Sequence, residues 1–222
     1  MTDYKKKILI ATGGTGGHVF PAYSLAKYFI KNQSSVDIVT DRRGFEFLKN
    51  YEGIKLKIIN SETIFKKNPI IAIFSFIKIN IAFISSLIFL FRSKPRIVFG
   101  MGGYSSFPVC LAAKILNIPF ILYENNLIIG KANRILLPFS HKLFVSYAAV
   151  EGIGKKHENK KIEIGNIIRE EIINSNQDTR SSRKDIISIL ILGGSQAAKS
   201  FGEMLPEIFA ECVKEGVKLK IY

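Results

Sequence analysis

The chain alternates short apolar runs with longer stretches that have helical spacing. Continuous runs rich in Ile, Val and Phe, typical of strands buried on both faces, occupy Lys7–Ala11, Val36–Thr40, Lys55–Ile59, Arg96–Phe99 and Phe120–Tyr123. Helical stretches such as Pro21–Asn32 and Phe107–Leu116 lie between these runs. The alternation predicts βαβ units, and therefore an α/β fold whose parallel sheet carries helices on both faces.

Proline positions suggest where two of these helices begin and end. Pro21 and Pro108 fall near the expected helix starts, where a missing N–H costs little. Asn117-Ile118-Pro119 is expected to end the second helix.

The pattern changes in the last third of the chain. A charged segment that contains serines, Asn174–Asp185, is typical of a linker. After it we expect a strand at Ile186–Leu192, a helix to about Glu215 and a strand at Val217–Tyr222. The predicted organisation is a parallel-sheet α/β domain over residues 1–165, a linker over 166–185, and over 186–222 the incomplete start of a second domain. A piece of that size rarely buries enough apolar surface to fold alone.

Three glycine-rich turns follow β-branched runs, at 13–18, 100–106 and 193–196. A strand that turns through glycines into a helix offers backbone N–H groups and a positive helix end to phosphates. Two such turns in the first half indicate a diphosphate ligand. Neither common nucleotide motif fits the first turn: the dinucleotide fingerprint needs a glycine where Val19 stands, and a P-loop would not end in Gly17-His18. A nicotinamide enzyme, in which Asp41 would hold a ribose, and a nucleoside triphosphatase are therefore disfavoured.

His18 follows the first turn and would begin a helix. A helix N-terminus favours a neutral imidazole, which suits a general base. The alternative is that His18 only bonds to a backbone carbonyl and positions the loop.

Composition narrows the setting. A net charge of +14 favours anionic partners, although no nucleic-acid motif is present. Two cysteines are too few for a disulfide framework and suggest a reducing compartment. The apolar run after Lys5-Lys6-Lys7 is too short for a signal peptide, so the cytoplasm is expected. No carboxylate-rich metal cluster is seen, and no cofactor is expected.

Five ordered blocks then resemble the MurG family of glycosyltransferases: Gly13-Gly14-Thr15-Gly16-Gly17-His18-Val19-Phe20-Pro21, Gly100-Met101-Gly102-Gly103-Tyr104, Tyr123-Glu124-Asn125-Asn126, Gly165-Asn166 with Arg169, and Gly193-Gly194-Ser195-Gln196. The resemblance implies a GT-B fold of two Rossmann-like halves. It also implies transfer of N-acetylglucosamine (GlcNAc) from UDP-GlcNAc to lipid I, the undecaprenyl-diphosphate-linked MurNAc-pentapeptide. The product is lipid II of peptidoglycan synthesis, formed with inversion at the anomeric carbon.

The resemblance also implies roles for individual residues. His18 would be the base that deprotonates the MurNAc 4-hydroxyl. The acceptor diphosphate would bind at Gly14, Gly102, Gly103, Tyr104 and Ser105. The donor UDP-GlcNAc would bind at Thr15, Gly16, Gly17, Asn126, Arg169 and Ser195. A surface ion pair for Arg169, an N-cap for Ser195 and a turn for Asn126 are the simpler interpretations.

The segment Ile70–Phe91 contains fifteen Ile, Leu or Phe residues among twenty-two and has basic residues on both sides. By hydropathy its insertion as a membrane span is close to balanced. Spanning, however, would separate the first two glycine turns across the membrane. We therefore expect a helix that rests on an anionic bilayer at the cytoplasmic face of the inner membrane, with an ordinary buried helix as the alternative.

The family's uridine pocket lies beyond the segments matched here, so we expect weak donor binding by this chain alone. Two alternatives remain open: a non-catalytic protein that binds lipid diphosphates, and one piece of a split enzyme.

Overall fold

The computed structural model describes residues 7–51, 53–59, 69–174, 186–193 and 198–222. The chain divides into two compact units, Met1–Ser175 and Asn176–Tyr222, which are treated separately below. The boundaries predicted for the linker stay a prediction, since residues 175–185 lie outside the described residues.

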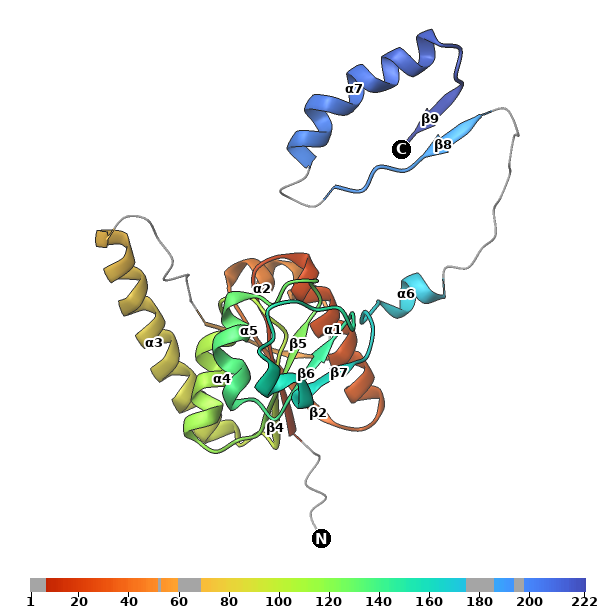
Figure 1. The fold of residues 1–222 in the computed structure, drawn as a ribbon. Coiled ribbons are helices and arrows are strands. Elements are labelled where there is room, and N and C mark those ends of the chain that lie inside the picture. Colours follow the sequence, from red (N-terminus) through yellow and green to blue (C-terminus); the bar gives the residue numbers. More distant parts are fainter. Residues whose placement is uncertain (1–6, 52, 60–68, 175–185, 194–197) are drawn as a thin grey trace. The chain divides into compact units, whose positions relative to one another are not determined.

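The first unit is built on one parallel seven-stranded sheet (Figure 1). Its strands are β1 (Lys7–Ala11), β2 (Ser35–Thr40), β3 (Lys55–Ile58), β4 (Ile97–Gly100), β5 (Phe120–Glu124), β6 (Lys142–Val145) and β7 (Lys161–Glu163). Their order in the sheet is β3-β2-β1-β4-β5-β6-β7, and every neighbouring pair is parallel. The direction of winding therefore reverses between β1 and β4, the position at which doubly wound sheets bind ligands.

Helices cover both faces of this sheet, as the sequence predicts. The helices of the first unit are α1 (Gly16–Lys31), α2 (Arg42–Leu48), α3 (Pro69–Ser93), α4 (Ser106–Ile115), α5 (Lys131–Leu136) and α6 (Glu170–Ile173), with 3₁₀ turns η1 (Leu137–Phe139) and η2 (Lys155–Lys160). Alternate residues of β1 enter different cores. Leu9 packs with residues of α3, α4 and α5, whereas Ile8 and Ile10 pack with residues of α1 and α2.

One expectation about local structure is wrong, and two strands of the sheet were not predicted. Helix α1 begins at Gly16 and not at Pro21, because Thr15 is the extended N-cap residue, and Pro21 therefore lies inside the helix. Strands β6 and β7 were not predicted from the sequence. Strand β7 has three residues and is a polar edge strand, so it carries little apolar signal.

Helix α3 packs against α4 and has an unusual distribution of side chains. Its buried positions are mostly small: Ser75, Ala82 and Ser86, with Leu90. Its exposed positions carry large apolar side chains, namely Phe74, Phe76, Ile77, Ile81, Ile84, Ile88 and Phe91. Within the described part of the chain it alone has the length and apolar composition of a membrane span, over Phe74–Ser93. Since α3 joins β3 and β4 of one sheet, the fold keeps it on the surface of the first unit.

The second unit is a single βαβ arrangement. Parallel strands β8 (Ile187–Ile189) and β9 (Leu219–Ile221) are joined by α7 (Ala198–Lys214). The expected elements are present, although both strands are shorter than predicted. None of the described residues in this unit is buried, so the unit has little core of its own.

Candidate functional site

The first two glycine loops touch each other at the carboxyl ends of β1 and β4. Gly102 and Gly103 have φ angles of +88° and +77°, which favour glycine. A Cβ on Gly103 would collide with the carbonyl oxygen of Gly13. The two backbones can therefore approach this closely only because both loops are made of glycine.

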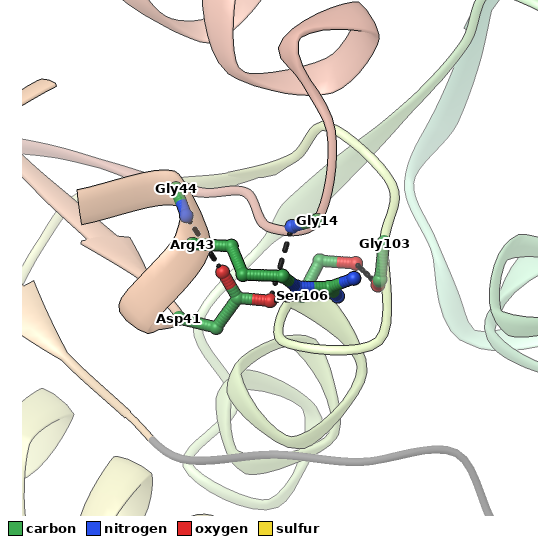
Figure 2. Close-up of polar contacts among 6 residues, drawn as sticks. All are labelled: Gly14, Asp41, Arg43, Gly44, Gly103 and Ser106. Carbon is green, nitrogen blue, oxygen red and sulfur yellow. Dashed lines mark hydrogen bonds and ion pairs between the residues drawn. The ribbon is translucent and has the colours of Figure 1, made fainter. Parts of the chain in front are cut away.

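A carboxylate holds the first loop in place (Figure 2). Asp41, which follows β2, accepts hydrogen bonds from the backbone N–H groups of Gly14 (3.1 Å) and Gly44 (2.8 Å). The Arg43 guanidinium lies 3.3 Å from the same carboxylate and is two-thirds exposed. The Gly14 N–H is thus already engaged by the protein, and a phosphate would reach it only by displacing Asp41.

His18 lies in the first turn of α1, with its ring against the second glycine loop. A Cβ on Gly102 would stand 2.9 Å from the His18 ring. The Nδ1 atom is buried, and the described residues offer it no hydrogen-bond partner. Burial lowers the pKa of the His18 imidazole, although the Glu124 carboxylate and the Met101 carbonyl oppose part of that change. His18 is therefore neutral at pH 7 and can accept a proton.

The loop after β5 forms the third side of the site. Glu124 is almost fully buried, and its carboxylate accepts hydrogen bonds from Gly130 N (2.8 Å), Asn133 Nδ2 (3.0 Å) and Asn126 Nδ2 (2.7 Å). The neighbouring Asn125 reaches across to the first loop, where its Nδ2 donates to the Gly17 carbonyl oxygen at 2.9 Å.

Arg169, a predicted donor residue, also lies beside α1. Its guanidinium stacks on the Phe20 ring, with 4.5 Å between the guanidinium carbon and the ring centroid. The Phe20 ring in turn packs next to Gly16, where a Cβ would stand 2.9 Å from it. Arg169 is therefore brought close to the segment that contains Thr15, Gly16 and Gly17.

The remaining predicted residues differ in accessibility. Thr15, Asn126 and Tyr104 are exposed, with Tyr104 at 40 %. Ser105, in contrast, is completely buried against Gly13, and its Oγ has no partner among the described residues. Ser195 lies outside the described residues. Within the described ranges, no group of three or more His, Cys, Asp or Glu side chains could hold a metal ion.

The sequence did not predict that the carboxylates of two residues in this region hold the loops in place. The sequence suggests for Asp41 only a ribose-binding role, and Glu124 is part of a family block without a role of its own. Both acids stand at the carboxyl end of a strand in a parallel sheet, which is a recognisable signal. Among the bonds described above, the Gly14 N–H reaches Asp41 from a distant loop, whereas the partners of Glu124 follow it closely along the chain.

Solved glycosyltransferases share the doubly wound sheet of the first unit, and the fold is that of GT-B-like proteins. The solved structure of MurG from Acinetobacter baumannii matches with a TM-score of 0.68 and 28 % identity, covering 90 % of this chain and 56 % of that one. A glycosyltransferase from Rickettsia africae shares the fold, with a TM-score of 0.67, 17 % identity, and coverage of 99 % of this chain and 68 % of that one.

Residues 8–145 match the glycosyltransferase family 28 N-terminal domain, and the chain belongs to that family. A relative from Pelagibacter ubique is 37 % identical over 98 % of this chain and 59 % of its own length. A second relative, from Francisella tularensis, is 33 % identical over the whole of this chain and 61 % of its own length. Both are named UDP-N-acetylglucosamine--N-acetylmuramyl-(pentapeptide) pyrophosphoryl-undecaprenol N-acetylglucosamine transferase. The chain thus spans about three fifths of the length of these relatives, and the predicted family resemblance is confirmed.

Proposed function

We propose that this chain carries the acceptor-binding half, and the start of the donor-binding half, of an inverting GlcNAc transferase. The reaction would move GlcNAc from UDP-GlcNAc to the 4-hydroxyl of MurNAc in lipid I and give lipid II. The observation that carries the proposal is the meeting of two glycine loops with a neutral, partly buried histidine at the switch point of the sheet. The names of the relatives supply the substrates.

The chemistry requires a base, because the acceptor hydroxyl must lose its proton as it attacks the anomeric carbon. Inversion follows when that attack comes from the side opposite the departing UDP. In the proposal, His18 takes the hydroxyl proton as the new glycosidic bond forms and the bond to UDP breaks. Burial keeps the imidazole unprotonated and ready to accept that proton. The base itself needs no metal for this step.

The acceptor diphosphate would lie against the second glycine loop at Gly102, Gly103 and Tyr104. The first loop would contribute the Gly14 N–H, once the hydrogen bond from that N–H to the Asp41 carboxylate is broken. Arg43 is the cation nearest to that exchange, since a Cβ on Gly14 would stand 3.7 Å from its Nη2. Burial of Ser105 favours a packing role for its hydroxyl over direct contact with the acceptor.

The donor would meet this half at Thr15, Gly16, Gly17 and Asn126, with Arg169 and Ser195 on its diphosphate. The Arg169 guanidinium stacked on Phe20 supports this assignment, because the stack holds a cation beside the first loop.

Transfer of labelled GlcNAc from UDP-GlcNAc to a lipid I analogue, in the presence of anionic liposomes, tests the proposal. We expect His18→Gln to abolish transfer without weakening acceptor binding. Transfer unaffected by that substitution would refute the role of His18. Acceptor binding without transfer would instead support a non-catalytic lipid-diphosphate binder, and transfer restored by a separate C-terminal half would indicate a split enzyme.

We also propose that α3 holds the protein on an anionic membrane surface, at the cytoplasmic face of the inner membrane. Its exposed apolar side chains support this location, as does a hollow of about 400 Å³ in which Lys57 and Arg92 flank Ile81, Ile84 and Ile88. Apolar side chains would enter the bilayer while the cations meet lipid phosphates.

Vesicle co-sedimentation tests this location. Ile84→Glu should lower binding to anionic vesicles at least tenfold. Tyr28→Glu, which adds the same charge at an exposed side chain of α1, serves as the control and should leave binding nearly unchanged. Equal binding by both variants would rule out α3 as the membrane surface.

A further inference from the structure

Helix α1 contains a proline whose missing N–H leaves one helix carbonyl without its usual donor. In an α-helix each backbone N–H bonds to the carbonyl four residues earlier, so residue 21 would serve the Gly17 carbonyl. Pro21 has no N–H to donate. The Gly17 carbonyl immediately precedes His18, and the missing bond therefore falls next to the proposed base.

The side chain of Asn125 takes the place of that donor. Its Nδ2 donates to the Gly17 carbonyl oxygen at 2.9 Å, from a loop 108 residues away along the chain. Asn125 Oδ1 in turn accepts from Asn126 Nδ2 at 3.4 Å, and the same Nδ2 donates to the buried Glu124 carboxylate at 2.7 Å. One hydrogen-bonded series thus links the buried acid, the Asn126 side chain and the first turn of α1.

We propose that Asn125 is a positioning residue, which replaces the backbone donor lost at Pro21 and fixes the His18 turn relative to the Asn126 loop. This inference rests on the proposed function, in which His18 is the base and Asn126 contacts the donor. Asn125 touches neither substrate in this account and acts through the Gly17 carbonyl. A small displacement of a catalytic group is costly, because the attacking hydroxyl and the base must stay within hydrogen-bond reach.

The hydrogen bond dictates which substitutions should be tolerated. Gln keeps an amide donor on a longer side chain and should restore the contact. Asp has nearly the same shape but presents only acceptors at neutral pH, so it should fail as Ala does. Replacing Pro21 by Ala returns a backbone N–H to the helix and should make Asn125 dispensable.

The experiment uses the whole 222-residue chain with Asn125→Ala, Asn125→Asp, Asn125→Gln, Pro21→Ala and the double variant Pro21→Ala/Asn125→Ala. One readout is amide hydrogen exchange at His18 and Val19, whose N–H groups both donate to the Thr15 carbonyl. The exchange of Val109 in α4 serves as an internal reference. The second readout is kcat and KM for GlcNAc transfer to a lipid I analogue.

We expect Asn125→Ala and Asn125→Asp to speed exchange at His18 and Val19 about three- to tenfold, with Val109 unchanged. The same variants should lower kcat about tenfold or more, while the KM for the acceptor changes less than about threefold. Gln should restore both readouts. In the Pro21→Ala background, Asn125→Ala should change each readout less than about threefold.

The inference is overturned when Asn125→Ala leaves exchange at His18 and Val19 unchanged, or when its effect in the Pro21→Ala background equals its effect in the unsubstituted chain. A fall in Val109 protection of equal size would also overturn it, because that result marks general destabilisation. If the unsubstituted chain transfers no GlcNAc, the proposed activity fails for this chain, and the exchange rates alone decide the inference.

Discussion

Gly103 lies where the first and second glycine loops pack most tightly against each other. Gly103→Ala should lower the free energy of unfolding by about 3–5 kcal/mol, because a Cβ would combine positive-φ strain with a collision against the Gly13 carbonyl. Gly165→Ala is the matched control: its φ is +78°, but nothing lies within 4 Å of the added Cβ. The control should cost only about 1–2 kcal/mol in urea unfolding. Equal losses would show that the loops can move apart freely.

His18 should make the stability of the protein depend on pH. Its pKa is lowered in the folded state, so below pH 6.5 the unfolded chain takes up a proton that the folded chain does not. Its contribution to stability is complete above pH 6.5 and declines as the pH falls toward the folded pKa. Urea unfolding between about pH 7 and pH 5 should therefore show a smaller loss of stability for His18→Gln than for the unsubstituted protein.

The residues of the site differ in how readily sequence alone identifies them. His18 and the glycines could be identified because a strand, a glycine turn and a helix follow one another locally. The bonds from Asp41 to Gly14 and from Asn125 to Gly17 join residues 27 and 108 positions apart. Only the order of strands in the sheet brings those loops together, and no local pattern carries that information.

Among the helices, α3 has one side that packs in the core and one side whose apolar residues are exposed. Leu90 is fully buried and Ile88 is 49 % exposed on the same helix. Leu90→Ala should lower the free energy of unfolding by about 2–5 kcal/mol, whereas Ile88→Ala should change it by less than about 1 kcal/mol. Thermal or urea unfolding without lipid measures both. A large loss for Ile88→Ala would indicate that its side chain is covered in solution.

Element boundaries were predicted well where apolar runs are long and poorly where tertiary contacts override the local signal. The five strands predicted up to Tyr123 correspond to β1–β5, and the two predicted after residue 185 correspond to the shorter strands β8 and β9. Helix α1 starts before Pro21, where the local sequence predicts its start, and a distant side chain supplies the donor that the Gly17 carbonyl lacks. Strand β7 is recognisable only from its pairing with β6.

At the scale of the whole molecule, the two units should differ in stability. The first contains two buried cores, whereas none of the described residues of the second is buried. Each unit carries one cysteine that can report on it. Cys110 is completely buried, and burial raises the pKa of its thiol to about 12, while Cys212 is half-buried in α7. A thiol reagent should therefore label Cys212 in native buffer and label Cys110 only after the first unit unfolds.

Pulsed labelling across a urea gradient, with each site detected by mass spectrometry, measures this difference. We expect the Cys212 transition at a lower urea concentration than the Cys110 transition. Cys110→Ala and Cys212→Ala variants identify the labelled sites. A single shared transition would contradict the expectation and indicate that the two units unfold together.

The α/β class, the glycine loops, the place of His18 after the first loop and the family could all be predicted without the tertiary structure. Each of these follows from residues that are close along the chain, where strand and helix periodicity act. The tertiary structure decided the rest: that Asp41 occupies the Gly14 N–H, that Ser105 is buried, and that Asn125 completes a helix weakened by Pro21. These contacts depend on which strands become neighbours, and in a parallel sheet neighbouring strands are separated by whole crossover segments of the chain.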